Sequence, residues 1–476
     1  MTNQNSGSYE KVLNKGDILA LAFGAMIGWM WVWTTGTWIL AAGVGGAVLA
    51  ILLGAVIVTF VAFCYAELSP AMPIAGAELA YSIRTLGNRQ AFIAEWFIIF
   101  GCVSVSAFET VAFPTVLAYV FPGYETHGYI WTIAGWDVYA SWVAVGVAGT
   151  IIFTILNYRG VSIAALVNKI LTVVLALVGI AFVGGTLSMG DSSNIAPVFT
   201  DMSGFFLVLG MTPLAYVGFN VIPQTAAEIN LPYRLIGKIL MLSVVMATAW
   251  YSLITFGVGM ALNNEEIAYA DANGLATLEA AIAVYGRGVT LVIITGGLCG
   301  ILTSWIGFFM GGARAISSMA RAKMLPEFLG KIHPVYKTPT NAVILIGVIT
   351  CLTPLLGRKV GVWLIDAGSA GIVFSWFFVC YAFIKLRKFE PDLERPYRAP
   401  GGSMMGYLGM IACAFMCIIF LPGMPSALVW PYEWALMIGW IVLGVIFSTW
   451  AKSTYGAVTR EWRYEQIFGE KPKKLY

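Results

Sequence analysis

The sequence predicts an all-α protein that crosses a lipid bilayer twelve times. Of its 476 residues, 59% are hydrophobic and only 11% are charged, whereas soluble proteins carry about 25% charged residues. The apolar residues are grouped into long runs, and about 20 such residues are enough to span a bilayer as one helix. Twelve runs lie at 17–43, 45–68, 91–120, 139–157, 161–188, 203–225, 236–262, 288–316, 340–356, 361–385, 405–422 and 429–450.

The basic residues lie on every second connection between these runs, which predicts the orientation of the chain. Connections that face the cytoplasm are rich in Lys and Arg. If the N-terminal segment 1–16 is cytoplasmic, the only basic residues in the connections on the opposite side are Arg287, Arg358 and Lys359. The alternation holds over all twelve runs and places the tail 451–476 in the cytoplasm. We therefore expect a multi-pass protein of the cytoplasmic (inner) membrane with both termini inside.

Several classes of function are not supported by the sequence. The connections between the runs are too short for a soluble catalytic domain, and the chain has no Walker A motif for binding ATP. The seven cysteines lack the spacing of a metal site or of a disulfide framework. We therefore expect no enzyme, no bound cofactor and no nucleic-acid partner.

The first apolar run is interrupted by glycines near its middle. It contains the stretch Gly24-Ala25-Met26-Ile27-Gly28-Trp29-Met30-Trp31-Val32-Trp33. Glycine lowers helix stability, and non-helical backbone survives at membrane depth only where protein buries it or water lines it. This predicts a broken helix that faces a cavity. A second interpretation is that Gly24 and Gly28, spaced four residues apart, only let two helices pack closely.

The sixth run contains a matching interruption. It reads Pro213-Leu214-Ala215-Tyr216-Val217-Gly218-Phe219-Asn220-Val221-Ile222-Pro223-Gln224, in which glycine, asparagine and proline each weaken a continuous helix. This run lies five spans after the first, where a second five-span repeat would begin. Broken helices expose unpaired amide and carbonyl groups. Such groups can bind a zwitterion without any charged side chain.

Four groups of motifs follow one another along the chain. The second run ends in Tyr65-Ala66-Glu67-Leu68 and is followed by Pro73-Ile74-Ala75-Gly76-Ala77-Glu78-Leu79-Ala80-Tyr81. The sixth run contains Gly218-Phe219-Asn220 and leads into Ala226-Ala227-Glu228-Ile229-Asn230-Leu231-Pro232. Met319-Ala320-Arg321-Ala322-Lys323-Met324-Leu325-Pro326 and His333-Pro334-Val335-Tyr336-Lys337-Thr338-Pro339 follow the eighth run, and Arg395-Pro396-Tyr397-Arg398-Ala399-Pro400-Gly401-Gly402 follows the tenth. In this order, these stretches resemble bacterial amino acid permeases of the amino acid–polyamine–organocation (APC) superfamily.

The resemblance implies a five-plus-five inverted-repeat (LeuT-like) core with two extra helices. The first repeat would cover residues 17–190, the second 203–386, and the extra helices 405–450. It also implies secondary active transport by alternating access. The residues that match the family's substrate-binding segments are Ile27, Gly28, Trp29 and Met30 in the first run and Gly218, Phe219 and Asn220 in the sixth.

The chain departs from the family pattern at two positions. The family commonly has Gly-x-Gly in the first run, where bare amides hold the substrate carboxylate, but here Met30 stands at the second glycine position. A side chain at this position narrows the approach to the backbone. Many proton-coupled relatives have a lysine in the middle of the fifth run, where this chain has Leu175. Lys169 lies six residues earlier, and we expect it to reach towards the membrane surface.

Glu109 is an acidic residue inside the third run. Intramembrane carboxylates are costly and mark functional sites. We therefore expect Glu109 to bind a substrate ammonium or to carry the coupling proton. The alternative is a protonated Glu109 that hydrogen-bonds to a neighbouring helix.

The first run also contains four tryptophans, at positions 29, 31, 33 and 38. Aromatic faces attract cations, and tryptophan does so most strongly. Trp29 and Trp33 are therefore candidates for a cation-binding cage, with Phe219 as a further wall. At least two of the four tryptophans are expected to face lipid or the membrane interface instead.

Two hydroxyl residues in the eighth run, Thr303 and Ser304, are candidates for a sodium site. Hard cations prefer oxygen ligands, and carbonyl groups of the broken first helix could complete such a site. The alternative is that both hydroxyls form hydrogen bonds between helices. No other metal site is expected.

Together these observations predict a secondary active transporter that imports an amino acid or a related amine, coupled to Na⁺ or H⁺. The alternatives are a transporter for a carboxylate-free amine or organic cation, an exchanger, or a substrate sensor. A channel would need a continuous polar pore, and a sensor would need a soluble output domain. The expected partners are the small-molecule solute and the lipid bilayer.

Overall fold

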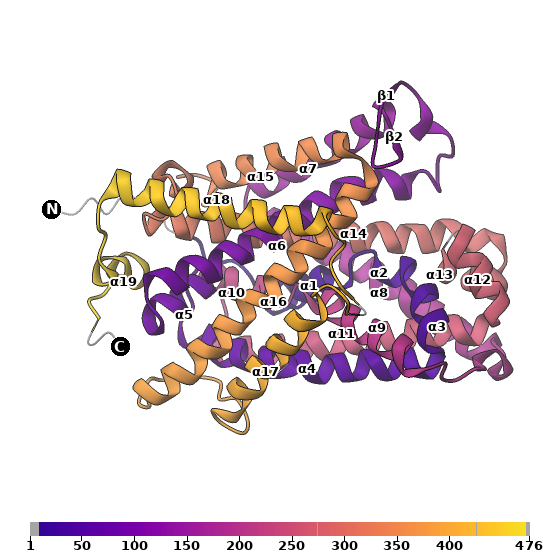
Figure 1. Ribbon diagram of the computed structural model, residues 1–476, viewed down its shortest axis with the longest axis horizontal. Helices are drawn as coiled ribbons and strands as arrows, with labels where there is room; N and C mark the ends of the chain where they lie inside the picture. The colour runs from indigo at the N-terminus through magenta and orange to yellow at the C-terminus, as the bar shows by residue number, and fades with distance from the viewer. Residues whose placement is uncertain (1–8, 274, 425, 473–476) are drawn as a thin grey trace.

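The computed structural model describes residues 9–273, 275–424 and 426–472. Apart from one short β-hairpin, every regular element in these residues is a helix, and the long helices pack side by side (Figure 1). This confirms the predicted all-α class. Residues 1–8 of the predicted N-terminal segment and residues 473–476 of the predicted tail lie outside the described residues.

The helices follow the order of the predicted runs. The first eight runs become α1 (Lys15–Ile27), α2 (Met30–Trp33), α3 (Thr35–Ala42), α4 (Val44–Ala71), α6 (Asn88–Leu117), α7 (Ala140–Tyr158), α8 (Val161–Met189), α9 (Met202–Tyr216), α10 (Val221–Gln224), α11 (Tyr233–Ala261) and α14 (Thr290–Arg321). The last four become α15 (Thr340–Leu352), α16 (Gly357–Phe389), α17 (Met404–Ile419) and α18 (Tyr432–Tyr455).

Shorter elements lie in the connections. They are α5 (Ala77–Thr85), η1 (Tyr124–Thr126), β1 (Tyr129–Ile133), β2 (Trp136–Tyr139), η2 (Ser192–Ile195), η3 (Ala226–Glu228), α12 (Asn264–Asn273), α13 (Ala276–Tyr285), η4 (Arg287–Val289), η5 (Glu327–Gly330), η6 (Thr353–Leu356) and α19 (Arg460–Phe468). The two strands pair in antiparallel register.

Ten helical segments of the described chain are long and apolar enough to cross a membrane. The ninth and tenth predicted spans form one helical stretch of 50 residues, Thr340–Phe389, and α17 has only 16 residues. Gly357 divides the long stretch with a φ of 78°. On its two sides, α15 packs against α7 whereas α16 packs mainly against α6. The described helices thus form a polytopic membrane protein, and the count of twelve spans stays a prediction.

The first and sixth membrane segments are both broken, and the break in the sixth lies against the last turn of α1. α1 ends at Ile27 and α2 begins at Met30, while α9 ends at Tyr216 and α10 begins at Val221. A Cβ atom added to Gly218 would lie 2.7 Å from the carbonyl carbon of Ala25. α1 packs on α8, α11 and α14, and α9 packs on α4. The two irregular stretches therefore lie inside the bundle.

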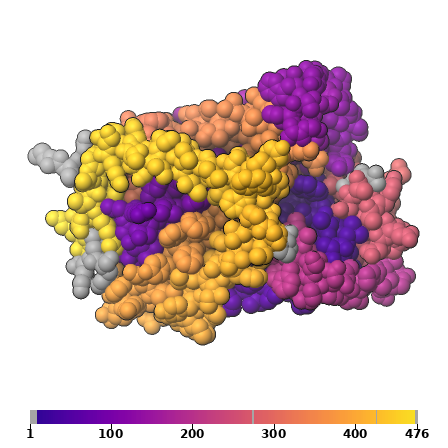
Figure 2. Space-filling view, viewed as in Figure 1, coloured from indigo at the N-terminus to yellow at the C-terminus, as the bar shows by residue number. Residues whose placement is uncertain are grey.

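The last long helix lies on the outside of the bundle. α18, drawn in yellow, crosses the front face of the molecule (Figures 1 and 2) and packs on α16 and α6. Apolar side chains on its outer face, such as Ile438, Val442 and Val445, remain exposed. Such a surface suits contact with lipid tails, which are as apolar as these side chains.

The bundle has two distinct ends. α19 and α5 lie at one end, and the β-hairpin lies at the other (Figure 1). We call the end that contains α5 and α19 the basic end, and the end that contains β1 and β2 the hairpin end. The Lys169 side chain is 38% exposed, and its Nζ pairs with Oδ1 of Asp17 at 2.7 Å; its reach towards the membrane surface stays a prediction. This ion pair joins α8 to the start of α1.

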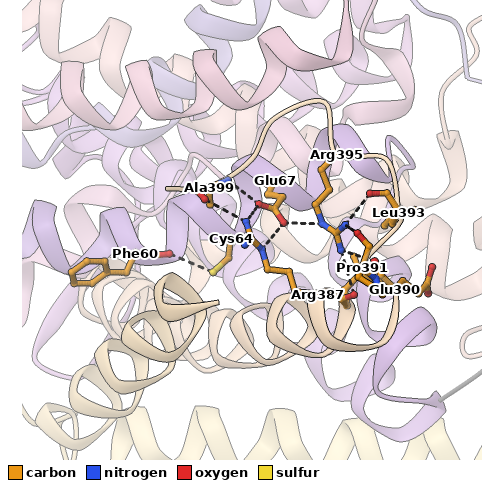
Figure 3. A network of polar contacts seen from close by, with 10 residues as sticks. Phe60, Cys64, Glu67, Arg387, Glu390, Pro391, Leu393, Arg395 and Ala399 are labelled. Atoms are coloured by element: carbon orange, nitrogen blue, oxygen red, sulfur yellow. Dashed lines mark hydrogen bonds and ion pairs between the residues drawn. The ribbon is translucent and has the colours of Figure 1, made fainter. Parts of the chain in front are cut away.

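One buried carboxylate at the basic end, that of Glu67, is paired with two arginines. The Glu67 carboxylate lies between Arg387 and Arg395, 3.0 Å from Nε of Arg395, and accepts the N–H of Ala399 at 2.8 Å (Figure 3). Burying a charge is costly unless a partner compensates it. The two arginines therefore tie α4 firmly to α16 and to the connection that follows α16.

The four tryptophans of the first run contradict one expectation. Trp29, Trp31 and Trp38 are buried, with exposed fractions of 6%, 0% and 0%, and Trp33 is half-buried. The prediction that at least two of them face lipid or the interface is wrong. The physical reason is that α11 and α13 cover α2 and α3, so that Trp31 packs edge-on against Trp250.

Candidate substrate-binding site

The break in the first segment separates the roles of its two glycines. Gly28 has a φ of 50° and a ψ of −141°, a conformation that is essentially restricted to glycine. Gly24 lies inside α1, where an added Cβ would come within 2.7 Å of the Thr303 Cβ. Gly28 therefore breaks the helix, and Gly24 allows α14 to pack closely, so each of the two sequence interpretations applies to one glycine.

The last carbonyl groups of α1 have a partner outside the helix. Tyr251 of α11 donates its hydroxyl to the carbonyl oxygens of Met26 and Ile27, at 2.8 Å each. Carbonyl groups at a helix end have no intrahelical partner. Tyr251 therefore stabilises the broken conformation. Tyr251 was not predicted from the sequence, although a tyrosine in an apolar run is a possible signal.

The break in the sixth segment runs from Val217 to Asn220 and is stabilised by its own side chains. The backbone N–H of Gly218 donates to Oδ1 of Asn220 at 3.2 Å. The ring of Phe219 stacks on Trp376, with the ring centroids 5.0 Å apart. All three predicted residues, Gly218, Phe219 and Asn220, are fully enclosed by protein, whereas Val217 faces a cavity.

That cavity lies beside both breaks and has a volume of about 210 Å³. It is lined by residues of α1, α2, α3, α6, α9, α14 and α16. Among the predicted site residues, it brings together Ile27, Gly28, Trp29, Met30, Trp33, Glu109 and Ser304. Gly218, Phe219, Asn220 and Thr303 are not part of its lining. Their assignment as binding residues stays a prediction.

Two acidic side chains line the cavity, and one of them was missed. Glu109 of α6 is 2% exposed, and no donor of the described residues hydrogen-bonds to its Oε2. Asp366 of α16 faces the same cavity. Asp366 lies in an apolar run just as Glu109 does, so the same signal could have identified it. Among the described residues that line the cavity, none is basic.

Trp33 belongs to a stack of planar groups at the hairpin-end side of the cavity. Its ring lies nearly parallel to that of Phe108, at 7° and with the centroids 6.4 Å apart. The Arg358 guanidinium lies 5.4 Å from the Trp33 centroid and 5.7 Å from that of Trp136 in β2. Cations are attracted to the face of such rings. The stack therefore links α2, α6, α16 and the hairpin.

The two hydroxyl residues of α14 have different surroundings. Thr303 donates to the Gly24 carbonyl at 3.1 Å and also contacts carbonyls of its own helix. Its own carbonyl accepts from Asn168 of α8 at 3.1 Å. Thr303 thus makes the interhelical hydrogen bond that was the alternative to a sodium site. Ser304 lines the cavity instead.

Comparison with known proteins places the chain in a family. A family model described as "Amino acid permease" matches residues 16–447, which is nearly the whole chain. The chain belongs to the amino acid permease family. The APC resemblance seen in the motifs is thereby confirmed, and the permease is a transporter rather than an enzyme.

Several curated proteins are similar to this permease over most of their length. It is 25% identical to the branched-chain amino acid permease BcaP of Bacillus subtilis over 417 residues, which cover 86% of this chain and 88% of that protein. It is 24% identical to the methylthioribose transporter of B. subtilis over 451 residues, 93% of each chain. It is 23% identical to the aspartate-proton symporter of B. subtilis over 427 residues, 86% of this chain and 79% of that protein. The names of these relatives refer to different solutes, so the family alone does not select the solute.

Proposed function

We propose that this permease is a secondary active transporter that imports a small amine-bearing solute across the cytoplasmic membrane in symport with H⁺ or Na⁺. Its twelve spans would comprise two inverted repeats, residues 17–190 and 203–386, followed by α17 and α18. Both termini and the basic end would lie in the cytoplasm, as the distribution of Lys and Arg favours.

The observation that carries this proposal is the cavity beside the two helix breaks. Glu109 and Asp366 give it two carboxyl groups, and no basic residue lines it among those described. Trp29 adds an aromatic face that attracts a cation, whereas Trp33 already contacts the Arg358 guanidinium. A volume of about 210 Å³ is below the roughly 300–1,000 Å³ of pockets for drug-sized ligands. The cavity therefore suits a small solute with an ammonium group.

An amino acid is the first candidate for that solute. The backbone amides at the break around Gly28 could hold its carboxylate, because amides at a helix start have no intrahelical partner. Relatives named for branched-chain amino acids and for aspartate support this choice.

A carboxylate-free amine is the second candidate, and Met30 favours it. The Met30 side chain lines the cavity at the second glycine position of the family pattern, where it hinders a carboxylate from reaching the backbone. The acidic lining also favours a net positive solute, because a carboxylate would lie near Glu109 and Asp366.

A thermal-shift screen of the purified permease tests the proposed solute class. Leucine would be compared with 3-methylbutylamine, and lysine with 1,5-diaminopentane, because each pair differs by one carboxylate. A solute at 100 times its Kd stabilises the folded state by about 2.7 kcal/mol. We expect the amino acids to raise Tm more than their amines; the reverse order supports the second candidate. If no amine-bearing solute among a broad set of amino acids and amines raises Tm, the proposed class is wrong.

A further inference from the structure

Two glutamates at the basic end are buried without a basic partner. Glu78 lies in the first turn of α5 and Glu95 in α6, and both have an exposed fraction of 0%. Glu67 and Glu228 are buried at the same end, but each forms an ion pair with arginine. Among the described residues, neither Glu78 nor Glu95 has such a pair.

A single amide group joins the two carboxyl groups. Nε2 of Gln224 donates to Oε2 of Glu78 and lies 3.4 Å from Oε1 of Glu95. The Tyr65 hydroxyl donates to Oε1 of Glu78 at 2.6 Å. Oε1 of Gln224 is buried and has no hydrogen-bond partner among the described residues. The cluster therefore draws together α4, α5, α6 and α10.

The remaining groups around the pair are neutral. Glu95 accepts the backbone N–H of Leu79 at 2.8 Å and the Ser318 hydroxyl of α14 at 3.3 Å. The titratable groups that face the pair are Tyr65 of α4, Tyr81 of α5 and Cys102 of α6. Arg314 of α14 lies one turn from Ser318, but it pairs with Glu228 at 2.8 Å. No basic side chain of the described residues therefore compensates a second negative charge.

Two buried carboxylates that share one donor cannot both ionise cheaply. Burial disfavours each charged form, and a neighbouring like charge disfavours it further. For Glu78, which lies outside the membrane-spanning helices, burial raises the pKa to about 7. The pair therefore keeps a proton near neutral pH.

The position of α10 controls the donor that the two glutamates share. Gln224 is the last residue of α10, the second half of the broken sixth segment. If α10 moves away from α5 and α6, water reaches both carboxyl groups, and the burial that is the main cause of the raised pKa of Glu78 is relieved. This relief outweighs the loss of the Gln224 donor and lowers the affinity of the pair for a proton. By reciprocity, proton binding favours the docked position of α10, in which the pair is buried.

We propose that Glu78 and Glu95 form the proton-coupling site of this permease, and that α10 controls whether the pair binds or releases its proton. A proton from the exterior is held on a carboxylate oxygen while Gln224 is docked, and it passes to cytoplasmic water when α10 moves away. Only an O–H bond forms and breaks. This inference rests on the proposed function, since coupling requires transport.

The test uses the full-length permease in liposomes with labelled leucine and labelled 3-methylbutylamine as probes. Glu78→Gln and Glu95→Gln each keep the shape of the side chain but cannot cycle a proton. Both should retain counterflow against unlabelled solute within about twofold of the wild type. In both variants, the accumulation that an acidic exterior drives should be at least tenfold lower than in the wild type. Glu327→Gln at the exposed ion pair with Lys323 is the matched control and should retain both activities.

Accumulation that survives in both glutamine variants overturns the inference. The inference is also overturned if Glu109→Gln loses accumulation while Glu78→Gln and Glu95→Gln retain it, because proton coupling would then lie in the cavity. Should one variant fail to fold, the other still decides, because each removes one carboxyl group of the same pair.

Absence of counterflow in the wild type with any amine-bearing solute would instead refute the proposed function, and a second measurement then tests the proton site alone. A pKa raised in the folded state makes protonation stabilising, and this stability is lost as pH rises from about 4.5 to about 7. In detergent, the Tm of Glu78→Gln relative to the wild type should therefore increase over this range. A difference that does not change with pH overturns the proton site.

Discussion

Glu109 is the more enclosed of the two carboxyl groups that line the cavity. Its carboxyl group is almost fully buried and lines the cavity, and its Oε2 accepts no hydrogen bond from the described residues. A buried acceptor without a donor is costly in the absence of a ligand. An ammonium group would supply the missing donor and the compensating charge.

Replacing Glu109 by Gln should therefore weaken the binding of any amine-bearing solute. A hydrogen bond to a charged group contributes about 1.5–3 kcal/mol, so affinity should fall about 10- to 150-fold. Titration of labelled solute in counterflow measures this change. Glu327→Gln, at the exposed ion pair with Lys323, is the control. Wild-type affinity and pH dependence in Glu109→Gln would remove Glu109 from the site.

Met30 decides how closely a carboxylate can approach the first break. Met30→Gly restores the glycine pattern of the family, and we expect it to raise affinity for leucine relative to 3-methylbutylamine, because the backbone amides become accessible. Met30→Leu keeps the bulk and is the matched control. Competition of both solutes in counterflow gives the ratio. An unchanged ratio in Met30→Gly would show that the side chain does not restrict the carboxylate.

At the scale of the helices, the two breaks were predictable, but the direction of their side chains was not. Glycine and proline weaken a helix wherever they occur, so Gly28 and Gly218 could be read from the sequence. The Phe219 ring turns away from the cavity because it stacks on Trp376 of α16, which lies far from Phe219 in the sequence. The burial of Trp31 and Trp38 was not predictable either, because their neighbours belong to helices whose positions in space cannot be derived from the sequence.

The conformation of Gly28 leads to a prediction for the first segment. A residue with a Cβ atom at φ 50° and ψ −141° is strained by about 1–3 kcal/mol. Gly28→Ala should therefore lower Tm in detergent and reduce solute uptake. Gly439→Ala is the control, because Gly439 lies in α18 with no atom within 4 Å of an added Cβ, and alanine there favours the helix by about 1 kcal/mol. Equal Tm values for the two variants would contradict a functional break at Gly28.

At the scale of the whole molecule, the order of the apolar runs predicted the order of the helices, because a span needs only length and hydrophobicity. The sequence also predicted Glu109 as a cavity residue, but it did not predict that Asp366 shares the cavity or that Glu78 and Glu95 lie together. Those pairings arise from α5, α6, α10 and α16 packing into one bundle. Contacts between distant helices cannot be read from local hydropathy.

The central claim is that this bundle moves an amine-bearing solute against its gradient by using an ion gradient. The most direct measurement is uptake of labelled leucine and 3-methylbutylamine by the purified permease in liposomes with imposed H⁺ or Na⁺ gradients. We predict accumulation of at least one of them above equilibrium under an acidic exterior, unchanged when sodium is replaced by potassium and abolished by a protonophore. Uptake that only runs downhill and responds to no ion would contradict the claim.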